Sequence, residues 1–121
     1  MKIRIKGNSI RYRLSKSEVE EFKQDKYIEE FTDFGNSMFS YVLKVVNQPT
    51  VTAFFNGATI SIGVPPAIAK EWTDTEMVGF QHEYDLRNGS KLFLLVEKDF
   101  VCIDNTFEDQ SDNYPNPNGP C

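Results

Sequence analysis

The chain has 121 residues and a formal net charge of −5, and 40% of its residues are hydrophobic. This composition is typical of one globular domain with a buried core, and it excludes a disordered polymer. No apolar run approaches the roughly 20 residues of a membrane-spanning helix. The first residues also lack the apolar segment of a secretory signal, so we expect a cytoplasmic protein with no membrane partner.

The charge is unevenly distributed along the chain. Residues 1–17 carry six bases and no acid, residues 18–98 carry an excess of six acids, and residues 99–121 carry five acids without Lys or Arg. A general phosphate binder is usually basic overall, so the net acidity argues against a protein coated with nucleic acid. The net acidity does not exclude a local basic site at the N-terminal end.

In the first half, alternating apolar residues predict strands. Residues 2–6 and 10–14 alternate on either side of the turn pair Gly7-Asn8, which predicts a hairpin with one apolar face. Ser15 and Glu18 fit a capping box, and they predict a short helix over Ser15–Gln24. The other strands of this half are predicted over residues 27–34 and 38–46.

After a break at Asn47-Gln48-Pro49, the same order of elements recurs. Asn56-Gly57 is a strong hairpin signal between two alternating segments, and Pro65-Pro66 predicts a helix over Pro65–Trp72. Residues 92–96 are apolar on both faces, so we expect them to form a central, covered strand. The other strands of this half are predicted over residues 51–55, 60–64 and 78–86.

A shift of 50 residues superposes the two halves, for example Gly7 on Gly57 and Phe22 on Trp72. We interpret this as two tandem ββαββ units, residues 1–46 and 50–98, within one mainly β, barrel-like domain over residues 1–98. The alternative is that any two amphipathic ββα segments align by periodicity. Residues 99–121 are predicted to be an irregular, acidic, Pro- and Asn-rich extension. The predicted core is Ile3, Ile5, Ile10, Tyr12, Leu14, Val19, Phe22, Tyr41, Leu43, Phe55, Ile60, Ile62, Val64, Trp72, Val78, Phe80, Leu92, Leu94 and Val96.

The segment from Ile5 to Ser15 resembles the N-terminal segment of AbrB/MazE-type swapped-hairpin proteins, and the segment from Phe55 to Pro65 resembles a second copy. In that family two chains interleave their hairpins into one barrel. The resemblance therefore implies an intramolecular pseudo-dimer with a swapped-hairpin-like barrel. The whole chain also resembles an uncharacterised bacterial family of small proteins, which implies no activity.

The swapped-hairpin family reads DNA with its N-terminal hairpin, so the resemblance implies a nucleic-acid-binding face made of Arg4, Lys6, Asn8, Arg11 and Arg13. Arginines on short strands can contact bases or phosphates in the major groove. The second copy has Ala58, Ser61 and Gly63 in place of Asn8, Arg11 and Arg13, so only the first hairpin keeps the DNA-contacting residues that the resemblance implies. We expect a monomer or a homodimer. A monomer would then contact only half of a DNA site, whereas a homodimer could contact both halves. The alternative is a solvated basic face, or one that docks an acidic protein partner or the acidic extension.

No residue pattern points to catalysis, a cofactor or a metal. The acidic extension matches no EF-hand spacing, and Cys102 and Cys121, which could pair, give only weak evidence for a metal site with His82. We therefore expect a non-catalytic binding protein, either a DNA-binding or antitoxin-like regulator or a protein-interaction module without a nucleic-acid role. The remaining alternative is a metal-dependent enzyme that uses the acidic extension and His82.

Overall fold

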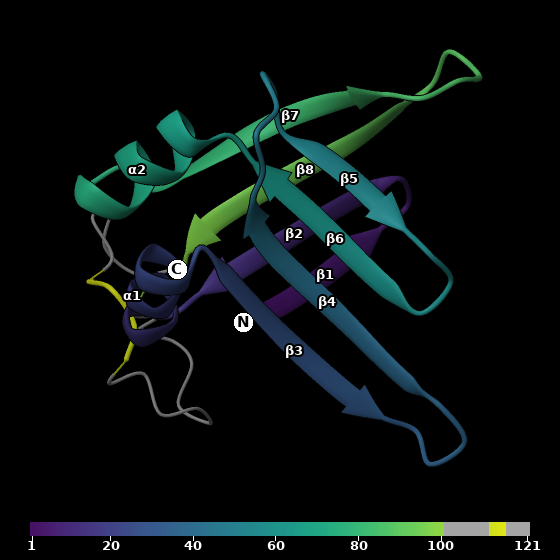
Figure 1. Ribbon diagram of the computed structural model, residues 1–121, viewed down its shortest axis with the longest axis horizontal. Helices are drawn as coiled ribbons and strands as arrows, with labels where there is room; N and C mark the ends of the chain where they lie inside the picture. Colours follow the sequence, from purple (N-terminus) through teal and green to yellow (C-terminus); the bar gives the residue numbers. More distant parts are fainter. Residues whose placement is uncertain (101–111, 116–121) are drawn as a thin grey trace.

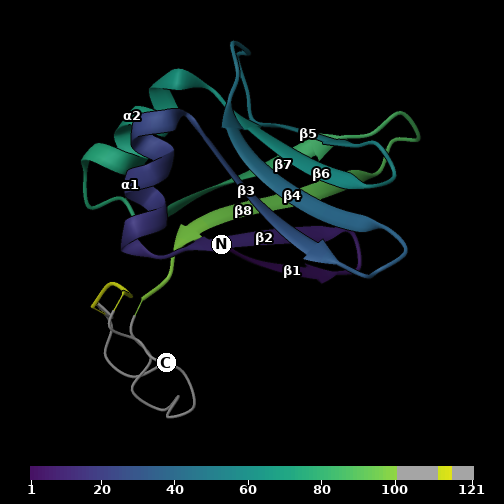
Figure 2. The same ribbon diagram turned by 60° about the horizontal axis from the view of Figure 1, so that its bottom comes forward.

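In the computed structural model, which describes residues 1–100 and 112–115, two β-sheets face each other and two helices lie at one end (Figures 1 and 2). The described elements follow the order ββαββ twice. They are β1 (Lys2–Lys6), β2 (Ser9–Leu14), α1 (Lys16–Asp25), β3 (Tyr27–Asp33), β4 (Met38–Val45), β5 (Thr52–Phe55), β6 (Thr59–Val64), α2 (Pro66–Asp74), β7 (Gly79–Asp85) and β8 (Lys91–Lys98).

Each sheet takes one hairpin from each half of the chain. The strand order is β1-β2-β8-β7 in sheet A and β3-β4-β6-β5 in sheet B. The hairpins are antiparallel, whereas the two central pairs, β2 with β8 and β4 with β6, are parallel. The prediction that residues 92–96 form a central strand is confirmed, because β8 lies between β2 and β7. The expected cover on both faces is wrong, because Phe93 is 48% exposed.

The two central pairs share one register. Ser9 lies opposite Phe93 in sheet A, and Thr59 lies opposite Ser40 in sheet B. Thr59 follows Ser9 by 50 residues and Phe93 follows Ser40 by 53, and these offsets hold along both pairs. The sheets therefore have the same internal arrangement, with the roles of the two halves exchanged.

The predicted barrel is not confirmed, because the described strands form two separate four-stranded sheets without a ladder between them. At the start of β1, the sheets are joined by side-chain contacts instead. The buried Met1 ammonium group pairs with Glu18 of α1 and with Glu30 of β3, and the Tyr41 hydroxyl donates to the Met1 carbonyl at 2.7 Å.

Both helices begin as the sequence predicts. Ser15 is the N-cap of α1, and its N–H donates to the Glu18 carboxylate at 2.9 Å. Pro66 occupies the first turn of α2, where its missing N–H costs nothing. Phe22 of α1 meets Trp72 of α2 edge to face, with 6.1 Å between ring centroids. The helices thereby close one end of the space between the sheets.

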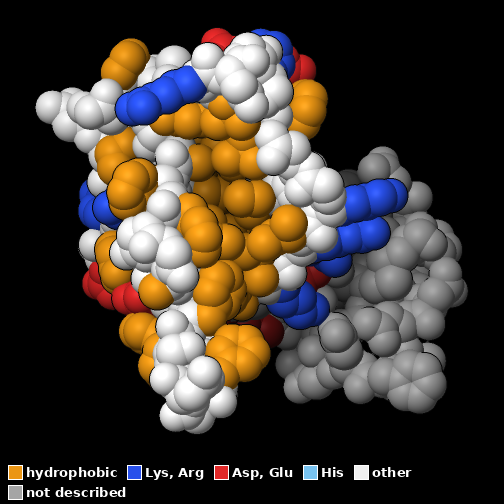
Figure 3. Space-filling model, turned by 90° about the vertical axis from the view of Figure 1, so that its right-hand side faces the viewer, with side chains coloured by type: hydrophobic (Ala, Val, Ile, Leu, Met, Phe, Trp, Pro, Cys, Tyr) orange, Lys and Arg blue, Asp and Glu red, His pale blue; other side chains and the backbone are white. Residues whose placement is uncertain are grey.

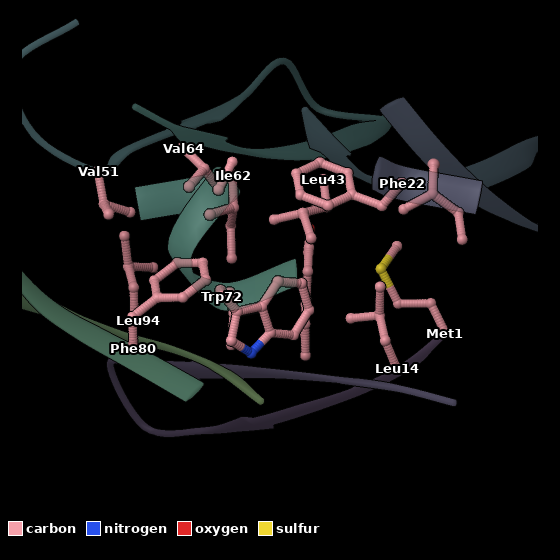
Figure 4. Close-up of a cluster of buried hydrophobic side chains, with 14 of the residues drawn as sticks. Met1, Leu14, Phe22, Leu43, Val51, Ile62, Val64, Trp72, Phe80 and Leu94 are labelled. Carbon is pink, nitrogen blue, oxygen red and sulfur yellow. The ribbon is translucent and has the colours of Figure 1, made fainter. Parts of the chain in front are cut away.

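The core lies between the sheets and under the helices (Figure 4). Most of the predicted core residues are buried, and Ile3, Tyr41 and Leu92 are partly buried at its margin. The prediction was wrong for Ile5, Phe55 and Val78, which are exposed. Ile5 and Phe55 lie near the hairpin ends of their strands, far from the helices, where alternation gives the correct face but no other described residue covers it. Sequence patterning missed Met1, Ile28, Val42, Val51 and Ala69.

Part of the acidic extension is described, and it contacts the start of α1. Lys16 N–H donates to the Asp112 carbonyl at 3.0 Å, and the Ser17 hydroxyl donates to the Asp112 carboxylate at 2.7 Å. Hydrogen bonds from the Ser15 hydroxyl, and to a smaller extent from the Ser17 hydroxyl, lower the pKa of the Asp112 carboxyl group. Tyr114 stacks edge to face on Phe100. Cys102 and Cys121 lie outside the described residues, so their pairing stays a prediction.

Candidate functional site: a basic hairpin beside an apolar groove

The five residues predicted to bind nucleic acid all lie on the β1–β2 hairpin. Strand alternation places Arg4, Lys6, Arg11 and Arg13 on the face of sheet A that points away from the core, and Asn8 lies in the turn. Arg4 lies directly opposite Arg11. Like charges at such positions repel each other, so this arrangement needs acids nearby.

Acids at the end of β8 and just beyond it neutralise part of this face. Arg11 Nε donates to Glu97 Oε1 at 2.6 Å, and an Arg13 guanidinium nitrogen lies 2.8 Å from Asp99 Oδ1. Lys2 Nζ lies 3.0 Å from the other oxygen of Asp99, whose side chain is only 5% exposed. The parallel β2–β8 pairing brings these groups together, so Arg11 and Arg13 are held by the fold.

Of the other three predicted residues, the side chain of Asn8 has a hydrogen-bond partner, whereas those of Arg4 and Lys6 do not have one among the described residues. The Asn8 amide donates to the Lys91 carbonyl at 2.6 Å, so it joins the ends of two hairpins. Arg4 and Lys6 are exposed, and their side chains form no hydrogen bond or ion pair within residues 1–100 and 112–115. Within the described part of the chain, these two cations of the predicted set are the ones without an acidic partner.

His82 lies on β7 and is half buried, with its side chain on the same face as Phe80 and Tyr84. Among the described residues, no group of three His, Cys, Asp or Glu side chains is arranged to hold a metal ion. Of the acids in the extension, residues 99–121, the structure describes Asp99 and Asp112, and Asp99 pairs with Arg13 and Lys2. Asp112 is engaged with Ser17.

Sequence reasoning missed an apolar groove at the end of the molecule opposite the helices (Figure 3). Figure 3 shows hydrophobic side chains gathered along the middle of this face, with Lys and Arg side chains around its margin. The groove has a volume of about 530 Å³. Its lining comes from both halves of the chain: Ile5, Asn8, Ile10, Phe39, Ala53, Phe54, Phe55, Ile60, Tyr84, Leu86 and Leu92.

The chemistry of this groove is almost entirely apolar. None of the described residues lines it with a charged side chain, and the Asn8 amide already binds a backbone carbonyl. Three of its side chains are highly exposed: Phe54 (69%), Phe55 (59%) and Ile5 (56%). Scattered exposed apolar residues are normal, but a contiguous concave set of them marks a binding surface.

One sequence signal pointed to this surface. Phe54 and Phe55 are adjacent in a strand, so alternation sends their side chains to opposite faces, and at least one had to lie outside the core. Ile5 and Phe55 are separated by 50 residues and are therefore equivalent positions of the two halves. Equivalent residues of the two halves thus line one groove.

A second cavity, of about 340 Å³, lies between α1 and α2 and is lined in part by Lys23, Lys26, Lys70 and Asp74. Lys23 Nζ pairs with Asp74 at 3.0 Å, and this hydrogen bond raises the pKa of Lys23 and lowers that of Asp74. Lys26 donates to the Lys23 carbonyl. These polar groups largely satisfy one another, so the apolar groove is the stronger candidate site.

Fold and groove together define a mainly β protein that buries its core between two sheets and leaves one end of that space open. No helix among the described residues is long and apolar enough to cross a membrane. The chain belongs to a family of unknown function (DUF7009), whose model matches residues 1–118. No match was found among curated proteins or among solved structures.

Proposed function

We propose that this protein is a binding protein and that its binding site is the apolar groove. The observation that carries the proposal is the exposure of Ile5, Phe54 and Phe55 around a concave, uncharged surface of about 530 Å³. Ligand sites commonly have volumes of about 300–1,000 Å³ and mostly apolar linings. Burying one such aromatic side chain against a ligand contributes about 1.5–3 kcal/mol.

The lining also indicates what the groove accepts. A charged group placed against these side chains would lose its hydration without gaining a partner, which is costly. The groove therefore favours an apolar ligand, or the apolar side chains of a protein partner. This agrees with the protein-interaction alternative considered from the sequence.

Nile red, an uncharged dye whose fluorescence rises on transfer from water to an apolar surface, is the probe that tests this proposal. We expect saturable binding by the folded protein and an affinity about tenfold lower in Phe55→Ser. Phe31→Ser is the matched control, because Phe31 is 60% exposed but does not line the groove. Equal probe binding by both variants, with unchanged circular dichroism, would contradict the proposal.

The basic hairpin supports a second candidate function, binding of duplex DNA by a regulator or antitoxin-like protein. The specific observation is that Arg4 and Lys6 are exposed and lack a partner within the described residues. Contacts of this kind release counterions, so binding would weaken steeply with salt. Because Arg11 and Arg13 are already paired with Glu97 and Asp99, Arg4 and Lys6 would carry most of the affinity.

A titration of short duplex DNA at low and moderate salt tests this candidate. We expect the Arg4→Gln, Lys6→Gln double variant to lose binding. A Lys44→Gln, Lys70→Gln variant, which removes the same charge elsewhere, should keep it. Absence of binding by the wild type at low salt would end the DNA hypothesis.

We also infer that the two halves are pseudo-equivalent units, as in a swapped-hairpin pseudo-dimer. The constant offsets of 50 residues for the N-terminal hairpins and 53 for the central β4 and β8 strands support this inference. So does the exchange of one hairpin from each half into the sheet of the other.

A further inference from the structure

The four edge strands of the two sheets differ in charge. The sequence of β1 contains three bases, β3 contains three acids and β7 contains two acids, whereas β5 (Thr52–Phe55) contains no charged residue. Proteins commonly place charges on edge strands to prevent pairing with another chain. Among the described strands, β5 is therefore the one edge without this protection.

The hydrogen-bonding groups of β5 are arranged for such pairing. Asn56 N–H donates to the Thr59 carbonyl at the end of the β5–β6 hairpin. Because hydrogen-bonded pairs alternate along an antiparallel ladder, Phe54 then bonds with Ser61, while the backbone groups of Ala53 and Phe55 point away from β6. The described residues provide no other backbone partner for these groups.

The space beside this edge belongs to the apolar groove. Ala53, Phe54 and Phe55 line the groove on the side of β5, and Tyr84 and Leu86 line it on the side of β7. A free strand edge and an apolar groove thus adjoin each other. This is the combination that domains use when they bind an extended peptide as an added strand.

We propose that an extended segment of a partner protein binds along β5 as a fifth strand of sheet B and places alternate apolar side chains in the groove. This proposal rests on the proposed function and adds the mode of binding. Backbone groups of Ala53 and Phe55 hydrogen-bond to the segment. Over about four residues the segment carries no charge, because neither β5 nor the groove lining offers a charged partner.

Selection from a phage library of random heptapeptides on the immobilised full chain provides the probe. We expect the selected sequences to alternate apolar residues and to lack charge at their centre. One selected peptide is then synthesised with single N-methyl groups at successive positions. Methyl groups at alternate positions, which face β5, should weaken binding at least about tenfold. Methyl groups at the intervening positions should leave binding unchanged, a pattern that contact through side chains alone does not give.

The protein variant Ala53→Pro removes one outward N–H without breaking the β5–β6 ladder. It should weaken peptide binding at least about tenfold, while circular dichroism and Trp72 fluorescence stay unchanged. Phe31→Ser, on the edge strand β3, is the control and should bind the peptide as the wild type does.

The outcomes separate this proposal from the proposed function. If the fluorescent probe binds in the groove but no peptide is selected, or if N-methylation has no alternating effect, strand addition is wrong and the groove remains a binding site. If the probe does not bind either, both proposals fail. If sedimentation shows a dimer that Ala53→Pro dissociates, the added strand comes from a second copy of this chain, and the partner-protein proposal is overturned.

Discussion

Tyr12 is fully buried between the sheets and joins the two halves of the chain. Its hydroxyl donates to the Ile60 carbonyl at 3.3 Å, and its ring packs near that of Tyr41, with 5.8 Å between centroids. Burial raises the pKa of Tyr12 well above its ordinary value, because the phenolate would lose its hydration. Burial also raises the pKa of Tyr41.

These pKa shifts predict sensitivity to alkaline pH. A raised pKa in the folded state stabilises the protein fully below the unfolded pKa of about 10, and this stabilisation is lost as the pH rises further. We expect Tyr12 to lower the free energy of unfolding by about 1 kcal/mol between pH 7 and pH 11. Urea titrations of wild type and Tyr12→Phe at both pH values measure the effect.

In Tyr12→Phe the loss between pH 7 and pH 11 should shrink but not vanish, because Tyr41 is unchanged. At pH 7 the variant should be less stable by about 1 kcal/mol, the usual contribution of one hydrogen bond. An identical pH dependence in both proteins would show that Tyr12 ionises as readily in the folded state as in the unfolded one.

At the scale of the elements, two glycines allow strands to pass close to their neighbours. A Cβ atom at Gly79 of β7 would lie 2.5 Å from the backbone oxygen of Val96 and 2.8 Å from Glu97 Cβ. A Cβ atom at Gly63 of β6 would lie 2.5 Å from Thr52 Oγ1 and 2.8 Å from Val46 Cγ2. The Val96 oxygen beside Gly79 belongs to the backbone and cannot move alone. The atoms beside Gly63 belong to the side chains of Thr52 and Val46.

We therefore expect Gly79→Ala to lower the free energy of unfolding by about 1–3 kcal/mol, the range for overpacking a filled site. Gly63→Ala should cost less, because Thr52 and Val46 can change rotamer. Urea midpoints of the two variants, measured side by side, give the comparison. A larger loss in Gly63→Ala would reverse the argument.

The sequence predicted the elements well because their signals are local. Turn pairs such as Gly7-Asn8 and Asn56-Gly57 marked the hairpin turns, and the capping residues Ser15 and Glu18 marked the start of α1. Alternation then gave the correct face for Ile10 and most core residues. These signals depend on residues within a few positions of one another.

The partners of the strands and the binding site could not be read in the same way. That Arg11 pairs with Glu97 depends on the β2–β8 register, which joins residues more than 80 positions apart. That Ile5 and Phe55 are exposed depends on how far the cover over each strand extends, and alternation carries no information about it. The basic residues lie on the outer face of the β1–β2 hairpin, and their role stays a prediction. Which of these cations have partners among the described residues, and the groove itself, required the structure.

At the scale of the whole molecule, neither half can build a sheet of its own as observed here. Sheet A needs β7 and β8 of the second half, and sheet B needs β3 and β4 of the first. Segments of about 50 residues also bury too little surface to be stable alone.

We expect separate fragments, residues 1–49 and 50–121, to be unfolded by circular dichroism and to recover the strand signal when mixed. Trp72, buried in the intact protein, reports the recovery by fluorescence. A fragment 1–49 that folds alone would contradict this interleaved arrangement.

The parallel pairing of β2 with β8 also sets an order of events during synthesis on the ribosome. β2 ends at Leu14, whereas its partner ends at Lys98. At about 5–20 residues per second, the N-terminal hairpin waits about 4–17 seconds before β8 has been made. During that time one edge of β2 is open and its apolar face is uncovered. We expect the alternating bases of β1 and β2 to repel other copies of the nascent chain during this interval, which would limit aggregation before β8 has been made.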